Sequence, residues 1–185
     1  MPHEPLLLQH HTPDSAKQLI DDLVAVYAEV YDVPPYAGDP FFAVETYEER
    51  LLAAIEMDGF ETVTATAPDG TILGYVHGVT LPADRAWWVS LGDRRPDGIL
   101  GAATAGDVFW LRELMVRPAH TNQGLGRRLH DEIIAGRGQS WTTLTCIIDN
   151  QPVHDAYVRW GYEIIGRIKH AEESPVYDAM ILPNS

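Results

Sequence analysis

The stretch that most constrains the fold is residues 113–129, which reads as a β-strand, a glycine loop and an α-helix in direct succession. Pro118 ends the strand because it has no N–H to donate to a neighbouring strand. The helix follows at once, with Leu125, Leu129 and Ile133 at the spacing of one helix face. We therefore expect an α/β protein in which one strand delivers a loop to the start of a helix.

The glycine loop has the properties of an anion site. Gly124 and Gly126 let a ligand approach the backbone closely. The N–H groups at the start of a helix have no partner within the helix, and they lie at the positive end of its dipole. Arg127 and Arg128 add cationic charge. The pattern predicts a site for a pyrophosphate; the alternative is an ordinary strand-to-helix turn with glycines for packing.

Two familiar phosphate loops fit this stretch poorly. The phosphate loop of nucleotide hydrolases requires a Lys-Ser or Lys-Thr pair after its last glycine, and here two arginines follow. The dinucleotide fingerprint requires three glycines after the first strand of a unit, whereas only two fit here and they lie late in the chain. Gly124-Leu125-Gly126, placed after a Val-Arg-Pro strand end, instead resembles the acetyl-CoA loop of the GNAT N-acetyltransferases. Thr121 stands where that family carries Arg or Gln.

A second motif strengthens the resemblance. GNAT proteins commonly show Asn, six residues, Tyr, three residues, Gly and then an aromatic residue. This chain has Asn150, Tyr157, Gly161 and Tyr162 at that spacing. The resemblance implies a GNAT fold of the α/β (α+β) class over a single domain, residues 1–185. Such a fold has a mixed, mostly antiparallel sheet of about seven strands with splayed central strands, flanked by about four helices.

The resemblance also implies a binding site for acetyl-CoA. The central strand and the glycine loop would hold it through Leu114, Met115, Val116, Thr121, Asn122, Gln123, Gly124, Leu125, Gly126 and Arg127. Asn150 would hold the pantetheine arm, and Tyr157 would contact the sulfur and act as general acid toward the leaving thiolate. Glu113 is the candidate general base and His154 a weaker one; for Glu113 a solvated or salt-bridged strand residue is the alternative. No metal ligand set is expected, because His10 and His11 lack a third ligand.

The remaining chain gives a coarse order of elements. A first helix is expected from Pro13 to Tyr31, and a second from the capping box Thr46-x-x-Glu49. Strands are expected near residues 5–10, 62–67, 72–80, 107–116, 141–148, 162–168 and 176–182. The segment Leu81–Gly106 is irregular, and its Trp87-Trp88 pair either covers the core or lines a cavity.

Two further side chains have both a chemical and a structural interpretation. His77 either faces a site or is a structural histidine of its strand. Cys146 as a nucleophile would need a partner base, and a lone cysteine in a strand is more often a small core residue.

Charge and composition limit the classes of binding partner that we expect. A net charge of −14 argues against nucleic acid and suits a cationic substrate. No apolar run approaches the roughly 20 residues that span a bilayer, so no membrane partner is expected. Cys146 is the only cysteine, which favours a cytoplasmic address. A homodimer is left open.

The resemblance therefore implies an acyltransferase that moves acetyl from acetyl-CoA to a primary amine by direct attack, and the negative charge favours a small cationic molecule as acceptor. Two alternatives are left open. One is a non-catalytic acyl-CoA-binding or sensor module, and the other is an acetyltransferase for a protein or peptide amine. Tyr157 argues against the sensor, because a binder has no need of an acid there.

The net charge generates a first prediction. Cationic amines should be acetylated faster than neutral or anionic ones at low salt, because the negative field of the chain concentrates cations. The preference should shrink in about 0.5 M salt, where the Debye length falls well below 10 Å. Rates for a matched set of amines at two ionic strengths measure this. An anionic amino compound as the best acceptor at low salt would contradict it.

Overall fold

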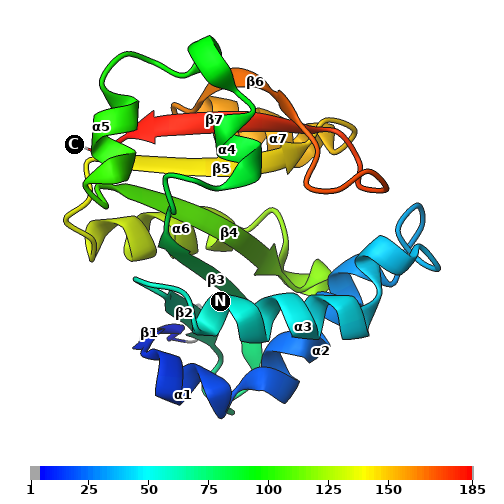
Figure 1. Ribbon diagram of the computed structural model, residues 1–185. Coiled ribbons are helices and arrows are strands. Elements are labelled where there is room, and N and C mark those ends of the chain that lie inside the picture. The colour runs from blue at the N-terminus through cyan, green and yellow to red at the C-terminus, as the bar shows by residue number, and fades with distance from the viewer. Residues whose placement is uncertain (1–4, 185) are drawn as a thin grey trace. The chain divides into compact units, whose positions relative to one another are not determined.

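The computed structural model describes residues 5–184 of the chain (Figure 1). The helices are α1 (Pro13–Lys17), α2 (Ile20–Tyr31), α3 (Val44–Ile55), α4 (Ala86–Val89), α5 (Ile99–Thr104), α6 (Leu125–Ala135) and α7 (Gln151–Arg159), with 3-10 turns η1 (Pro40–Phe42), η2 (Gly92–Arg94) and η3 (Pro118–His120). The strands are β1 (Leu7–His11), β2 (Glu61–Thr66), β3 (Ile72–Thr80), β4 (Val108–Val116), β5 (Trp141–Ile147), β6 (Glu163–Ile168) and β7 (Tyr177–Pro183).

These strands form one sheet of seven in the order β1-β2-β3-β4-β5-β7-β6 within the described chain. β1, β2 and β3 pair antiparallel, as do β5, β7 and β6, and β4 pairs with β5 in parallel at Val108–Trp110. Among the described residues only α2, α3, α6 and α7 reach nine residues or more. The expected mixed, mostly antiparallel sheet of about seven strands is confirmed; the described residues form seven α-helices where about four were expected, and the other three are short.

The chain divides into two compact units. The first comprises the chain up to Val79 together with Arg112–Arg137, and the second comprises Thr80–Leu111 and the chain from Gly138 onward. The first unit therefore holds β1 to β3, the C-terminal half of β4 and the helices α1, α2, α3 and α6. The second holds the N-terminal half of β4, the strands β5 to β7 and the helices α4, α5 and α7.

A tyrosine network joins the helices of the first unit to its sheet. α2 and α3 lie side by side (Figure 1). Tyr47 of α3 donates a hydrogen bond to the hydroxyl of Tyr75 on β3, which in turn donates to the Leu23 carbonyl at 3.1 Å. The ring of Tyr27 stacks on that of Tyr47 with centroids 3.8 Å apart. Burial raises the pKa of Tyr47 and of Tyr75 well above the ordinary value, so both hydroxyls stay protonated.

Gly74 on β3 lies against the end of β4. A Cβ at this position would lie 2.6 Å from the Met115 carbonyl oxygen and 3.2 Å from the Val116 Cα. Only glycine permits this approach, since both neighbours are backbone atoms that cannot move aside cheaply. Arg117 then fastens the strand end, because its N–H bonds the Leu73 carbonyl at 2.8 Å.

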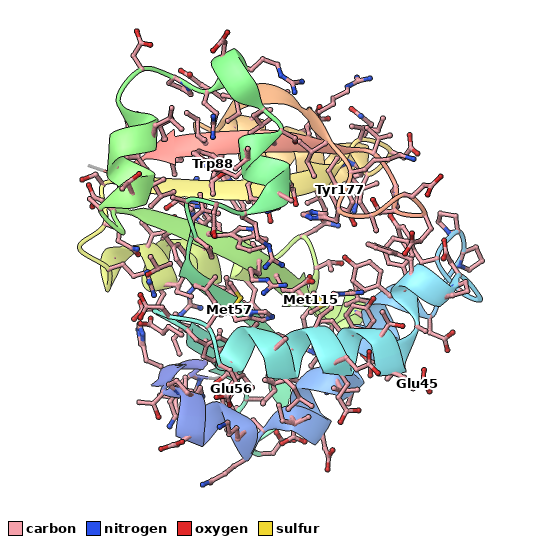
Figure 2. All side chains as sticks on the ribbon, in the orientation of Figure 1. Glu45, Glu56, Met57, Trp88, Met115 and Tyr177 are labelled. Atoms are coloured by element: carbon pink, nitrogen blue, oxygen red, sulfur yellow. The ribbon has the colours of Figure 1, made fainter. Side chains whose placement is uncertain are left out.

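The core of the second unit is covered by the segment that appeared irregular in sequence. Leu81–Gly106 contains α4, η2 and α5. Trp87 and Trp88 on α4 are both buried, and Figure 2 labels Trp88. Of the two interpretations of this pair, core cover is the one that the structure bears out. The Trp87 ring also contacts the ring of Trp110 on β4, with centroids 5.5 Å apart.

Two helix boundaries differ from the expectation. The expected first helix is interrupted after Lys17 and resumes at Ile20. The capping box at Thr46 is wrong, since α3 begins at Val44 and the Thr46 hydroxyl donates to the Pro40 carbonyl at 3.1 Å. That bond ties the helix to η1 instead of capping it.

The adjacent histidines of β1 serve separate contacts within the first unit. His10 bonds Glu61 through Nδ1 and Glu132 of α6 through Nε2, each at 2.9 Å. His11 is buried and bonds Ser15 and Thr64, each at 2.9 Å. Only the imidazolium can donate from both nitrogens, so the two carboxylates raise the pKa of His10, the Glu132 hydrogen bond contributing most.

This pair of bonds predicts a pH-dependent contribution to stability. Because the folded pKa of His10 is raised, the contribution is full below the unfolded pKa of about 6.5 and is lost as pH rises through the folded pKa. Urea unfolding of His10→Gln should therefore show its largest deficit relative to the unmodified protein near pH 5 and a smaller one near pH 9. A deficit that is independent of pH would show that the ring acts only by packing.

Candidate functional site

The glycine loop has the open backbone that an anion site needs. Gly124 forms the N-cap of α6 at φ 78°, and no side chain caps the helix there. A Cβ at Gly124 would meet nothing within 4 Å. The glycine is therefore required by its left-handed backbone and not by crowding. The uncapped start of α6 leaves N–H groups available to a ligand.

The polar side chains of the loop turn back onto their own backbone. The Thr121 hydroxyl donates to the Pro118 carbonyl at 2.9 Å, and the Gln123 side-chain amide donates to the Ala119 carbonyl at 3.4 Å. Asn122 has φ 59°, and among residues 5–184 it is the one non-glycine residue with a positive φ. The Thr121 and Gln123 side chains thus help to shape the loop, and the backbone N–H groups at the start of α6 are the candidate donors to an anion.

The two arginines after the loop differ in their contacts. Arg127 Nε donates to Asp131 Oδ2 at 2.8 Å, so its charge is partly matched. The Arg128 guanidinium makes no hydrogen bond or ion pair with any described residue. It lines a cavity of about 760 Å³, whose other lining residues are Leu6, Ala67, Pro68, Asp69, Thr71, Leu73, His120, Gln123 and Leu125. The cofactor contact expected of Arg127 stays a prediction, and Arg128 is a further cation that a ligand in this cavity can meet.

The side chain of Glu113 on β4 is half-buried. Its carboxylate makes no hydrogen bond or ion pair with the described residues. Burial raises its pKa, while the charges of Arg50 and Arg112 act in the opposite direction. Its charge also raises the pKa of the nearby hydroxyls of Tyr27 and Tyr47, although burial is the larger cause for both. Such a carboxylate can accept a hydrogen bond or a proton from a ligand that enters.

The cations near Glu113 are themselves held in place. Arg50 donates to the Phe41 carbonyl at 3.1 Å, and Arg112 Nη1 lies 3.2 Å from the Sδ of Met57, which follows α3 (Figure 2). His77 is buried in the same unit. Burial, with the charge of Arg112, lowers the pKa of His77 to about 3, so its ring is neutral at physiological pH. The structural interpretation of His77 therefore fits its position.

Leu114, Met115 and Val116 form the end of β4 in the first unit. Met115 is buried, and its carbonyl is the group that Gly74 accommodates. The backbone at this end of the strand is thus fixed by packing as well as by hydrogen bonds.

The second unit presents Asn150 and Tyr157 on α7. Asn150 is the N-cap residue, and its carbonyl accepts from the His154 N–H at 3.0 Å. Tyr157 is buried, and its ring meets Trp160 and Tyr162 edge-on with centroids 5.4 and 5.5 Å away. Gly161 ends the helix at φ 101°, where a Cβ would lie 3.3 Å from Leu182 Cδ1. The motif glycine is thus explained by backbone conformation and packing.

The sequence analysis missed one polar residue next to this helix. Asp178 of β7 accepts a hydrogen bond from His154 Nε2 at 2.9 Å, and both side chains are largely buried. The available signal was a single acid inside the otherwise apolar strand Tyr177–Pro183. Cys146 on β5 pairs in register with Asp178. Burial, with the charge of Asp178, raises the pKa of Cys146 to about 12, so the thiol is protonated and no nucleophile.

Comparison with known proteins identifies relatives of this arrangement. A family model described as acetyltransferase (GNAT) family matches residues 23–162. A putative GNAT acetyltransferase from Desulfovibrio desulfuricans is 19% identical, with 98% of this chain and 100% of that chain covered and a TM-score of 0.65. A GCN5-related N-acetyltransferase from Kribbella flavida is 20% identical, with coverage of 96% and 97% and a TM-score of 0.62.

A third solved structure, aminoglycoside 6'-acetyltransferase type Ii, is 17% identical, with 97% of each chain covered and a TM-score of 0.63. At these identities the three structures establish a shared fold. No curated protein matches the chain by sequence.

The open loop at Gly124 predicts a test of cofactor binding. Acetyl-CoA at about 100 times its dissociation constant should stabilise the unmodified protein by roughly 2.7 kcal/mol, because it binds only the folded state. Gly124→Val should lose most of this thermal shift while keeping its circular dichroism spectrum, since a β-branched residue distorts a loop at φ 78°.

Gly138→Val is the matched control. A Cβ at Gly138 also meets nothing within 4 Å, but its φ is not in the left-handed region. The control should keep the full thermal shift. Equal shifts in both variants would contradict a cofactor role for the loop.

Proposed function

The chain belongs to the GNAT family of acetyltransferases, and we propose that it transfers the acetyl group of acetyl-CoA to the primary amine of a small cationic molecule by direct attack of that amine. The observation that carries the proposal is the half-buried carboxylate of Glu113, which has no hydrogen-bond or ion-pair partner among the described residues. An ammonium substrate must lose a proton before it can attack, and a carboxylate of raised pKa suits that task.

The residues on the cofactor side fit acetyl-CoA, which supplies the activated acetyl thioester when bound. The uncapped start of α6, the open Gly124 and the uncommitted Arg128 suit a pyrophosphate. In this proposal Leu114, Met115 and Val116 present backbone groups to the pantetheine arm and the thioester oxygen, and Asn150 holds the arm. Tyr157 donates a proton to the leaving thiolate.

The preference for a cationic acceptor rests on the charge of the whole chain, which is −14. Arg50 and Arg112 partly offset the charge of Glu113, so this carboxylate alone does not attract a cation strongly. One neighbour of the same fold is named as an aminoglycoside acetyltransferase, which is consistent with a small amine acceptor. The family model spans parts of both compact units, and we propose that they act as one acetyltransferase domain.

The place of the enzyme in the cell is proposed from its cysteine content. Cys146 is the only cysteine, and it is buried and unpaired. A chain without a disulfide suits a reducing cytoplasm. No helix among residues 5–184 is long and apolar enough to cross a membrane.

The direct test is acetyl transfer itself. The protein with acetyl-CoA should increase the mass of at least one member of a panel of small amines by one acetyl group, with stoichiometric release of CoA. Binding of acetyl-CoA without transfer to any amine, protein lysine or peptide N-terminus would instead support an acyl-CoA sensor.

Glu113→Gln tests whether Glu113 acts as the general base and does not merely stabilise the fold. We expect kcat/KM to fall roughly 10²- to 10⁴-fold, as for loss of a positioned general base. In the unmodified enzyme kcat/KM should decline as pH falls through the raised pKa of Glu113, because the protonated acid cannot accept a proton; the variant should lack that decline. A group with raised folded pKa destabilises the fold at neutral pH, so the variant should melt no lower than the parent.

Glu45→Gln is the control for charge. It removes the same negative charge from an exposed position at the start of α3 (Figure 2). Its pH profile and turnover should match those of the parent. Equal losses in the two variants would show that the net charge of the chain, and not a base at position 113, controls the rate.

A further inference from the structure

The helix that carries Tyr157 has little apolar anchorage. α7 spans Gln151–Arg159, and Tyr157 is its single buried side chain. Val153 and Val158 are 41% and 45% exposed. A nine-residue helix is not stable alone, so tertiary contacts must fix both its existence and its rotation about its axis. Packing of one aromatic ring leaves that rotation weakly determined.

A polar contact lies one turn before the tyrosine. His154 Nε2 donates to Asp178 Oδ2 at 2.9 Å, and the two side chains are 14% and 8% exposed. Because the carboxylate accepts, Nε2 carries the proton. A hydrogen bond to a charged, largely buried acceptor is stronger and more directional than an exposed one.

The carboxylate of Asp178 is itself held on a rigid element. β7 pairs with β5 on one side and with β6 on the other. Arg167 of β6 places its Nε 3.5 Å from Asp178 Oδ1, the oxygen that His154 does not use. Asp178 is therefore a fixed reference point on the sheet to which α7 can be attached.

His154 and Tyr157 are three residues apart, so they lie on the same side of α7. A bond that fixes one of them fixes the direction of the other. We propose that the His154–Asp178 hydrogen bond is a positioning contact that sets the rotation of α7 and thereby aims the Tyr157 hydroxyl. This rests on the general-acid role of Tyr157 in the proposed function.

The surroundings favour positioning over a direct chemical role for His154. Its Nδ1 is buried without a hydrogen bond among the described residues, and the carboxylate oxygen Asp155 Oδ1 lies 3.7 Å away. Cys146, in register with Asp178, is a protonated thiol and cannot use His154 as the base of a nucleophilic pair. With Nε2 bonded to Asp178 and Nδ1 buried, the contact connects the helix to the sheet.

A double-mutant cycle tests the proposal. His154→Ala should lower kcat by roughly 10- to 100-fold, the cost of a reactive group misplaced by about 1 Å, and should leave the affinity for acetyl-CoA unchanged. Tyr157→Phe should lower kcat by roughly 10²- to 10⁴-fold. In the Tyr157→Phe background His154→Ala should cause no further fall, because the misplaced hydroxyl is already absent.

Two variants serve as conservative and matched controls. His154→Gln keeps an N–H donor and should recover most of the lost kcat. Asp155→Asn alters the exposed carboxylate beside Nδ1 and should leave kcat unchanged. If His154→Ala proves too unstable, the double variant His154→Ala/Asp178→Ala removes both partners and leaves no buried charge unpaired, since Arg167 is exposed; it should reproduce the same fall in kcat.

The outcomes separate positioning from general stabilisation. If His154→Ala causes the same fractional loss of kcat with Tyr157 intact as it does in the Tyr157→Phe background, the proposal is overturned. Unchanged kcat in His154→Ala would overturn it as well. Unchanged turnover in Tyr157→Phe would overturn both the acid role and the positioning. Absence of any acetyl transfer by the unmodified protein would contradict the proposed function instead.

Discussion

The close approach of β3 to the end of β4 at Gly74 is the constraint on which the first unit depends. Position 74 has no room for a Cβ because the Met115 carbonyl would lie 2.6 Å away. This approach fixes the position of the end of β4 against β3, and Arg117 secures that end with Nε on the Ile72 carbonyl at 2.7 Å and Nη1 on Glu29 at 2.6 Å. The glycine loop and α6 start within about ten residues of this point. The absence of a side chain at Gly74 therefore helps to set the place of the backbone that forms the candidate anion site.

The sequence predicted the strands well because their signals are local. Alternation in residues 62–67, the Pro68-Asp69-Gly70 turn and Pro118 each act within a few residues, and β2, β3 and β4 begin and end within one residue of the expectation. Helix boundaries were less predictable because tertiary contacts decide them. A capping box would have the Thr46 hydroxyl accept a backbone N–H, whereas Thr46 lies inside α3 and its hydroxyl donates to the Pro40 carbonyl of η1. The covering helices in Leu81–Gly106 depend on burial of Trp88, which no local pattern expresses.

The residues of the candidate site also differ in how well the sequence predicted them. Gly124, Gly126 and the Asn150 to Tyr162 spacing could be found because each belongs to a short motif. The environment of Glu113 could not, since Arg50 lies far earlier in the chain. Asp178 was missed for the same reason, as it meets His154 across 24 residues. Short motifs thus indicated the candidate site residues, while the residues that surround and orient them depend on long-range contacts.

The burial of Cys146 affects how readily the protein reacts with oxidants and thiol reagents. Peroxides, disulfides and alkylating reagents all require a thiolate, and burial beside Asp178 suppresses that form. The thiol of the folded protein should thus react slowly with such reagents. Chemical modification of Cys146 then requires local opening of β5. The rate of that modification therefore measures local unfolding in the second unit.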